Sequence, residues 1–165
     1  MKPQGKLFIF CGKMGAGKST MSLVVAEKYN AVRISEDEWL SVHYPTQIKT
    51  FDDYLHFSGR IKPCVKSLAQ SILAAGTNVV MDFPANTVSQ RSWFTTLCTE
   101  IGCEHELYYL DLSDKQCLSH IKKRRMEQPE RAHFDTEAVF NHVTQYFEPP
   151  HDDESLHTVL VGEQI

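Results

Sequence analysis

One short stretch near the N-terminus decides the fold: Gly12-Lys13-Met14-Gly15-Ala16-Gly17-Lys18-Ser19. It matches the Walker A pattern GxxxxGK[ST] in full, whereas the glycine fingerprint GxGxxG does not fit because Met occupies position 14. Glycines let the backbone curl with its N–H groups pointing inward, and the helix that follows adds the positive end of its dipole. The stretch therefore predicts a phosphate-binding loop (P-loop). The alternative is a glycine-rich turn with an exposed lysine.

The motif also indicates which groups meet a nucleotide. We expect Lys18 to span the β- and γ-phosphates as a point charge, the Ser19 hydroxyl to ligate Mg²⁺, and Thr20 to support the start of the helix. ATP and Mg²⁺ are therefore the expected cofactors. The loop residues expected to bind them are Gly12, Lys13, Met14, Gly15, Ala16, Gly17, Lys18, Ser19 and Thr20.

Segments with strand and helix patterns alternate on both sides of the loop. Residues 7–11 form a continuous apolar run, which is typical of a strand buried on both faces. The helix expected over residues 51–75 contains Gly59 and Pro63, which should break or bend it. Further strands are expected at residues 31–34, 77–82, 104–111 and 156–161, and helices at 19–29, 36–43, 87–101, 113–126 and 135–146, the last two capped by Ser113 and Asp135. The alternation predicts a parallel sheet with helices on both faces and ligands beyond the carboxyl ends of the strands.

Composition narrows the class of protein. The chain has 165 residues, 42% of them hydrophobic and 23% charged, which predicts one globular domain over residues 1–165. No apolar run reaches the ~18 residues of a membrane span, and the polar residues 1–5 are too short for a signal peptide. A pI of about 6.0 argues against a nucleic-acid surface. Five cysteines without a CxxC pair favour reduced thiols and a cytoplasmic protein. The sequence does not define the oligomeric state.

Over roughly residues 6–150 the chain resembles the small P-loop kinases related to polynucleotide 5′-hydroxyl kinases, zeta-toxin-type kinases and chloramphenicol phosphotransferase, which are often described as AAA-family ATPases. The P-loop is the specific part of this resemblance, and the weaker motifs identify the group rather than the substrate. The resemblance implies a three-layer α/β P-loop NTPase domain with a five-stranded parallel sheet in the order 2-3-1-4-5. It also implies a helical lid over about residues 122–135.

In this group an aspartate after the second strand is the general base, and Asp37 is the best match. A carboxylate near the γ-phosphate orients the attacking hydroxyl, which agrees with that role. The alternative is that Glu36, Asp37 and Glu38 form an acidic first turn that the helix dipole favours. Polynucleotide and zeta-type kinases often carry Arg or Lys three residues after the base, where this chain has Leu40. That departure argues against a phosphorylated or polynucleotide acceptor.

Three further residues are expected near the acceptor. Asp82 ends the apolar run of the third strand and could serve the Mg²⁺ shell or the acceptor. Arg91 lies in the segment where the relatives contact substrate, with a solvated helix residue as the alternative. Trp39 belongs to a group of aromatic residues that could form a wall for a ring-bearing substrate, with core packing as the alternative.

The basic run at residues 122–125 corresponds to the lid of the group. Arg124 best matches the arginine that contacts ATP phosphates there, and Arg131 is a second candidate; cations that only meet a helix C-terminus are the alternative. Phe147 and Pro149 fall where related kinases border adenine, although an ordinary helix end would explain them equally.

The leading hypothesis is thus an ATP- and Mg²⁺-dependent phosphotransferase that phosphorylates a hydroxyl of a small molecule. In this hypothesis Lys18 and a lid arginine stabilise charge, and Asp37 activates the hydroxyl. A nucleotide-binding ATPase or switch that acts on a protein partner is the first alternative. A 5′-hydroxyl polynucleotide kinase is the second, and it is weakened by the pI and by Leu40.

Overall fold

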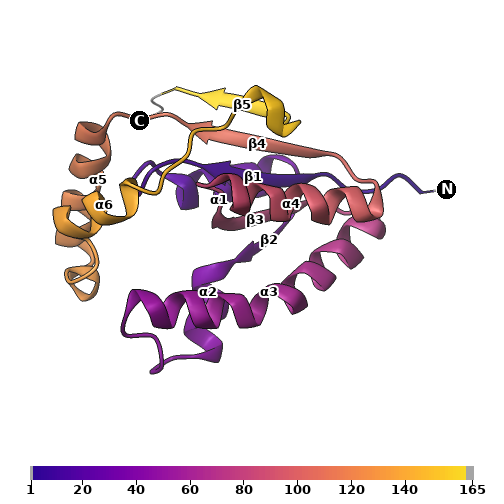
Figure 1. The fold of residues 1–165 in the computed structure, drawn as a ribbon. Helices are drawn as coiled ribbons and strands as arrows, with labels where there is room; N and C mark the ends of the chain where they lie inside the picture. Colours follow the sequence, from indigo (N-terminus) through magenta and orange to yellow (C-terminus); the bar gives the residue numbers. More distant parts are fainter. Residues whose placement is uncertain (1, 163–165) are drawn as a thin grey trace.

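Five parallel strands form one sheet in the computed structural model, which describes residues 2–162. Their order is β2-β3-β1-β4-β5, and this confirms the predicted fold class and strand order (Figure 1). The strands are β1 (Leu7–Cys11), β2 (Val32–Ser35), β3 (Val79–Pro84), β4 (His105–Leu110) and β5 (Thr158–Val161).

The first strand lies at the centre of the sheet because its side chains are apolar on both faces. Leu7 pairs with Val79 of β3 on one side and with His105 of β4 on the other. Along β1, Leu7, Ile9 and Cys11 join one hydrophobic cluster, whereas Phe8 and Phe10 join the other. A strand that is apolar on both faces must be covered on both faces, so this alternation produces three layers.

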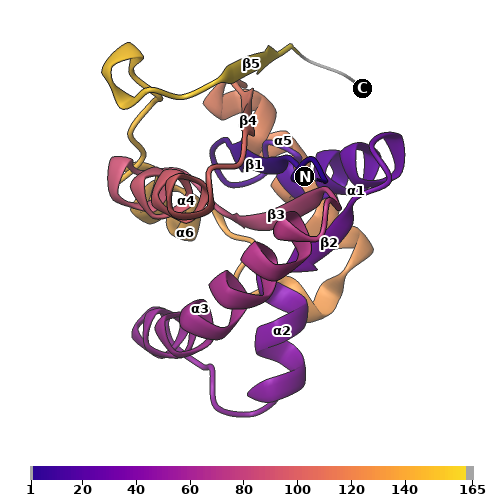
Figure 2. The ribbon, with the colours of Figure 1, turned by 90° about the vertical axis from the view of Figure 1, so that its right-hand side faces the viewer.

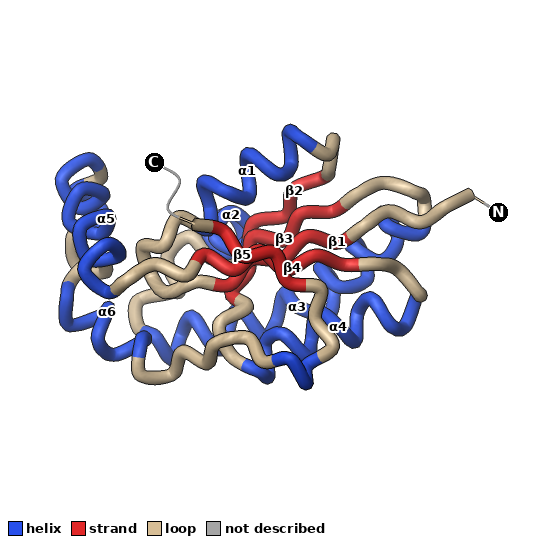
Figure 3. The backbone as a smooth tube through the Cα atoms, turned by 90° about the horizontal axis from the view of Figure 1, so that it is seen from above, coloured by secondary structure: helices blue, strands red, loops and turns tan. Residues whose placement is uncertain are grey.

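Helices cover the two faces of the sheet and the edge where its strands end. The helices are α1 (Lys18–Lys28), α2 (Glu36–His43), α3 (Phe51–Ala74), α4 (Val88–Ile101), α5 (Asp114–Glu127) and α6 (Glu137–Thr144), with short 3₁₀ turns at Pro129–Arg131 and Asp152–Glu154. Figure 3 shows α1 on one face and α3 and α4 on the other. In Figure 1, α5 and α6 lie beyond the carboxyl ends of the strands. The elements that could meet a ligand therefore gather at that end. Within the described part of the chain, no helix combines the length and the apolar character of a transmembrane segment.

The prediction that α3 breaks at Gly59 and Pro63 is wrong, because the helix is continuous from Phe51 to Ala74. A capping box starts it: Thr50 Oγ1 accepts a hydrogen bond from the Asp53 N–H (3.1 Å), and the Asp53 carboxylate accepts one from the Thr50 N–H (3.0 Å). A buried stripe then packs it on the core. Its direction changes along its length, as Figure 2 shows, so the expected bend is present without a break.

The N-terminal cap of α5 was predicted correctly, whereas that of α6 was not. Ser113 caps α5 as expected, within a capping box shared with Gln116. Asp135 does not cap α6; the N-cap is Thr136, whose hydroxyl accepts a hydrogen bond from the Val139 N–H (3.1 Å). The carboxylate of Asp135 is instead bound by two arginines, and that contact excludes it from the capping position.

Candidate active site

The P-loop connects β1 to α1 in a conformation that requires glycine. Gly15 and Gly17 have φ values of 81° and 97°, which residues with a side chain rarely adopt. A Cβ atom at Gly15 would also lie 2.6 Å from the carbonyl oxygen of Cys117, because α5 packs directly on the loop. The glycine spacing of the motif thus follows from the backbone conformation and from this close approach.

The ammonium of Lys18 lies over the loop. Its Nζ donates hydrogen bonds to the carbonyl oxygens of Gly12 and Lys13, the second at 3.0 Å. Burial lowers the pKa of Lys18 to about 8, and the charges of Cys11 and Asp82 oppose that shift. Burial disfavours the charged form of Lys18, and a neighbouring anion would stabilise that form. The loop is therefore suited to bind phosphate.

The first turn of α1 offers further donors. The helix begins at Lys18 after Gly17, and no side chain caps it. Its first backbone N–H groups, which include those of Ser19 and Thr20, have no partner within the helix and stand at the positive end of its dipole. This is the physical arrangement that binds anions at helix N-termini.

The amide of Asn86 fixes the start of the loop, a role that the sequence did not reveal. Its Oδ1 accepts the hydrogen bond of the Gly12 N–H at 3.0 Å. The backbone of Asn86 is held in turn by the Gln90 side chain and by the Glu148 N–H. The segment after β3 and the segment after α6 therefore both support the P-loop.

The carboxylate of Asp82 lies at the end of β3, opposite Ser35 of β2. Arg33 of β2 donates to it from Nη2 at 2.8 Å, and its other nitrogens bond Ser22 (2.8 Å) and Glu38 (3.0 Å). Arg33 was not predicted from the sequence to be a site residue. The feature of the sequence that could have indicated it is a positively charged residue inside a short strand.

The residues predicted to serve a metal are compatible with Mg²⁺. Mg²⁺ is held by few protein oxygens and takes the rest from phosphates and water. The Ser19 hydroxyl at the start of α1 and the carboxylate of Asp82 supply oxygens of that kind. No cluster of three or more His, Cys, Asp or Glu side chains that could hold a metal by itself occurs among residues 2–162. A metal here would therefore depend on the nucleotide's own oxygens.

Asp37 lies in the first turn of α2, exposed to solvent but surrounded by charged groups. Desolvation by neighbouring protein atoms raises the pKa of Asp37 above its ordinary value, and the charge of Asp82 raises it further. Arg131 and Arg124 act in the opposite direction. The structure thus brings the predicted base close to the third-strand aspartate and to both predicted lid arginines.

The two arginines of the segment at residues 122–135 share one buried anion. The Asp135 carboxylate, 1% exposed, accepts hydrogen bonds from Arg124 Nη2 (2.6 Å) and Nε (2.9 Å) and from Arg131 Nε (3.2 Å). Burial acts to raise the pKa of Asp135, but the hydrogen bonds and charges of the two arginines outweigh it and hold that pKa below its ordinary value. Asp135 therefore positions both arginines.

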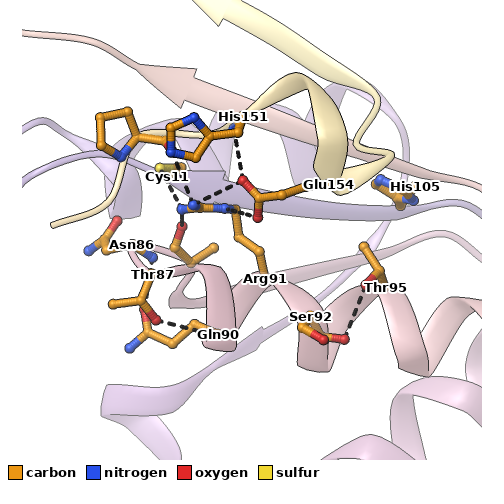
Figure 4. Close-up of polar contacts among 12 residues, drawn as sticks. Cys11, Asn86, Thr87, Gln90, Arg91, Ser92, Thr95, His105, His151 and Glu154 are labelled. Atoms are coloured by element: carbon orange, nitrogen blue, oxygen red, sulfur yellow. Dashed lines mark hydrogen bonds and ion pairs between the residues drawn. The ribbon is translucent and has the colours of Figure 1, made fainter.

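The structure does not give Arg91 the role expected from the sequence. Its side chain is fully buried, and it donates to the Glu154 carboxylate from Nε (2.9 Å) and Nη2 (3.2 Å) and to the Ala85 carbonyl from Nη1 (3.0 Å) (Figure 4). It also bonds the carbonyl of Pro149 at 3.3 Å. Arg91 is neither a solvated helix residue nor a group free to meet substrate. It joins α4 to the turn before β5, because Glu154 of that turn supplies the acid that pairs with its buried charge.

Phe147 and Trp39 occupy different environments. The ring of Phe147 lies 6.4 Å from that of Tyr109, with Lys13 Nζ 5.9 Å from its centroid. Trp39 is partly buried on the core and stacks on His43 at 5.3 Å, which agrees with the core-packing alternative.

Two cavities meet at the P-loop. The larger, about 860 Å³, is lined by Lys13, Met14 and Lys18 of the loop, by residues of α3, α4 and the end of α6, and by Phe147 of the segment after α6. The smaller, about 580 Å³, is lined by residues 15–17 and Thr20 of the loop together with Arg124 of α5 and Val161 of β5. The loop thus forms a wall of each cavity. Phe147 lines the larger cavity and Arg124 the smaller one, which separates the predicted adenine contact from the predicted lid.

The profile of the family described as "AAA domain" matches residues 7–150. The chain belongs to this AAA domain family. Among curated proteins, no match to the sequence is found.

Solved structures confirm the resemblance of this AAA domain protein to P-loop kinases and its fold. The APS kinase of Mycobacterium tuberculosis, in complex with AMPPNP and APS, is similar with a TM-score of 0.66 at 16% identity, over 97% of this chain and 89% of that one. A gluconokinase from Sinorhizobium meliloti 1021 is similar with a TM-score of 0.57 at 18% identity, over 97% and 82%. A candidate kinase from Chloroflexus aurantiacus j-10-fl gives 0.74 at 18% identity, over 97% and 86%. At these identities the likeness concerns the fold.

Proposed function

We propose that the protein transfers the γ-phosphate of ATP to a hydroxyl group of a small molecule. The observation that carries this proposal is the position of the P-loop between two cavities. The smaller cavity takes the nucleotide, because it contains residues 15–17 of the loop and Arg124. The larger cavity takes the acceptor and reaches the same loop at Lys13 and Lys18. A switch that only binds nucleotide has no need of the second cavity.

The roles of the side chains follow from this placement. Asp37 accepts the proton of the acceptor hydroxyl as its oxygen forms a bond to the γ-phosphorus. The bond from that phosphorus to the bridging oxygen of ADP breaks. Lys18 and Arg124, with Arg131 beside it, neutralise charge on the phosphate oxygens. Asp135 positions the two arginines and does not touch the reacting atoms.

Mg²⁺, held through Ser19 and Asp82, would supply further neutralisation of the phosphate charge. Phe147 belongs in this proposal to the acceptor cavity rather than to an adenine site, because it lines the larger cavity. Pro149 has no role in binding the nucleotide in this proposal, and its carbonyl accepts a hydrogen bond from Arg91. Trp39 and Arg91 support the fold.

The test compares transfer with simple hydrolysis. The protein is incubated with radiolabelled ATP, Mg²⁺ and a panel of hydroxylated metabolites and 5′-hydroxyl oligonucleotides, and the labelled product is identified by mass spectrometry. We expect a small molecule to gain the label. Asp37→Asn, which keeps the shape of the side chain but cannot take the proton, should lower transfer by ~10²–10⁴-fold with Mg·ATP affinity retained.

The adjacent Glu38→Gln is the matched control, because Glu38 is exposed and pairs only with Arg33. It should leave transfer nearly unchanged. Full transfer by the Asp37 variant would remove this residue from the mechanism. ATP binding without transfer to any acceptor would favour the switch, and transfer to oligonucleotides alone would favour a polynucleotide kinase.

A further inference from the structure

Glu36 is a buried acid on the wall of the larger cavity. It is the first residue of α2 and is only 3% exposed. The Tyr54 hydroxyl of α3 donates to its Oε1, and the Ser58 hydroxyl donates to its Oε2 at 2.7 Å. No lysine, arginine or histidine nitrogen lies within 4.0 Å of this carboxylate among residues 2–162. The protein thus buries the charge with hydroxyl donors and without an ion-pair partner.

Such an arrangement leaves binding capacity unused. A carboxylate has about four acceptor positions, and the two hydroxyl groups fill only part of them. Burial raises the pKa of Glu36 and Asp37 adds to that shift, whereas the hydrogen bonds of Tyr54 and Ser58 and the charge of Lys62 oppose it without cancelling it. A buried charge is stable only when paired, so a cationic donor that enters from the cavity would complete the site.

Gly59 gives an independent indication that a ligand approaches this wall. It lies inside α3, next to Ser58, and lines the same cavity. A Cβ atom at Gly59 would meet no atom within 4 Å, and its φ is not in the left-handed region. Glycine weakens a helix interior, and here neither packing nor backbone conformation requires it. Its effect is to leave open space on the wall of the cavity that Glu36 also lines.

The other walls of the cavity suit an apolar ring beside a cation. Aromatic side chains of α3, α4 and the end of α6 line it: Phe51, Tyr54, Trp93 and Phe147. Its lysines have other partners. Lys13 pairs with Asp114 at 2.7 Å, Lys18 bonds the P-loop carbonyls, and Lys62 Nζ lies 5.6 Å from the Trp93 ring centroid.

We propose that the acceptor is an amino alcohol, whose protonated amine binds Glu36 while its ring packs on the aromatic wall and its hydroxyl points to the P-loop. Glu36 is then the residue that determines specificity. This inference rests on the proposed function, since it assigns the larger cavity to the acceptor.

The test uses three probes that differ in one group: 2-amino-1-phenylethanol, 1-phenylethane-1,2-diol and mandelate. They share a phenyl ring and a secondary hydroxyl, and carry an ammonium, a hydroxyl or a carboxylate beside it. Binding to the full chain loaded with Mg²⁺ and AMPPNP is measured by calorimetry. We expect the amine to bind at least tenfold more tightly than the other two. Glu36→Gln should remove most of that preference, a loss of about ten- to a hundredfold in amine affinity.

A second variant keeps the inference testable if Glu36→Gln does not fold. Gly59→Ala should weaken amine binding about tenfold by placing a methyl group in the open space of the cavity, with an unchanged or higher Tm. Ser67→Ala, at an exposed position of the same helix, is the matched control and should leave binding unchanged. Wild-type preference for the diol or mandelate, absence of amine binding at millimolar concentration, or an unaltered preference in both variants would overturn the inference.

Binding is measured without transfer, so the two proposals fail separately. Amine binding without any phosphorylated product would contradict the proposed function and leave Glu36 as the amine site. Transfer to acceptors that lack an amine, with no preference that depends on Glu36, would retain the kinase and overturn the amine site.

Discussion

The P-loop and the lid segment both line the smaller cavity, but they are held by different means. The P-loop is fixed by its backbone, through glycines at positive φ, carbonyls that bind Lys18, and the Asn86 amide on Gly12. The lid segment is fixed by side chains, since Arg124 and Arg131 both depend on the one carboxylate of Asp135. The P-loop, held by its backbone, is rigid and is specified by its local sequence. The arginines of the lid segment can exchange the Asp135 carboxylate for a phosphate, which suits a segment that closes over substrate.

The largest effect should come from removing the lid charge that faces the reaction. Arg124→Ala should lower kcat by ~10³-fold or more while ADP affinity changes much less, because the charge that it neutralises develops during transfer. Steady-state kinetics and calorimetry measure the two quantities. Lys122→Ala is the control, because Lys122 is exposed on the same helix and lines neither cavity. Equal, small losses in both variants would show that the arginine serves only the end of α5.

Removal of the shared anion should affect the lid segment next most strongly. Asp135→Asn keeps the shape but loses the charge, so the free energy of unfolding should fall by about 1.5–3 kcal/mol. Because the pKa of Asp135 is lowered in the folded state, this stabilisation is complete above its ordinary value of 3.8 and is lost as the pH falls further. Thermal unfolding as a function of pH measures it. Thr136→Ala removes only a cap, should cost ~1 kcal/mol, and should show no such acid dependence.

The P-loop should respond to backbone strain instead. Gly15→Ala forces a side chain into the left-handed region and against the Cys117 carbonyl, and it should cost about 1–3 kcal/mol of stability. Gly17→Ala has a similar φ, but its nearest contact is a Leu110 side-chain carbon at 3.9 Å. The difference between the two denaturation curves isolates the contact with α5. If the variants are equally destabilised, that close approach does not constrain the loop.

The smallest expected effect is a pH dependence of nucleotide affinity. Because burial lowers the pKa of Lys18 to about 8, the free protein loses this charge as the pH rises past that value. Bound phosphate favours the charged form, so ATP binding should take up a proton above pH 8 and weaken by up to about tenfold per pH unit. Calorimetry in buffers with different ionisation enthalpies measures the uptake. Lys18→Met, uncharged throughout, should show none.

The same contrast explains how much the sequence could predict. The P-loop and the alternation of strands and helices follow from local patterns, whereas the sheet order followed from the resemblance to small P-loop kinases, and the structure agrees with all three. The Ser113 cap was predictable because its capping partner lies three residues away. Gly59 and Pro63 were expected to break or bend α3, and the helix bends without breaking because a long buried stripe outweighs their low helix propensity.

The side-chain partnerships were not predictable because they join distant segments. Nothing near Arg91 in the sequence indicates that Glu154 neutralises it, so the residue was predicted to contact substrate, with a solvated helix residue as the alternative. Asp135 was interpreted as a cap because aspartate before a helix usually is one, and only the fold brings Arg124 to it. Glu36 was considered only as part of an acidic turn, since its burial against Tyr54 and Ser58 depends on the packing of α3.

The central position of β1 has a consequence for the order of events during synthesis. The P-loop leaves the ribosome before the strands that start at Val79 and His105, yet β1 pairs with both of these strands. Arg91, packed beside Cys11 at the end of that strand, meets its acid only when Glu154 has been added. At elongation rates of about 5–20 residues per second, the nucleotide site stays incomplete for several seconds. A nascent chain stalled within β4 would therefore expose apolar β1 surface to chaperones and have no means of using ATP to stabilise itself.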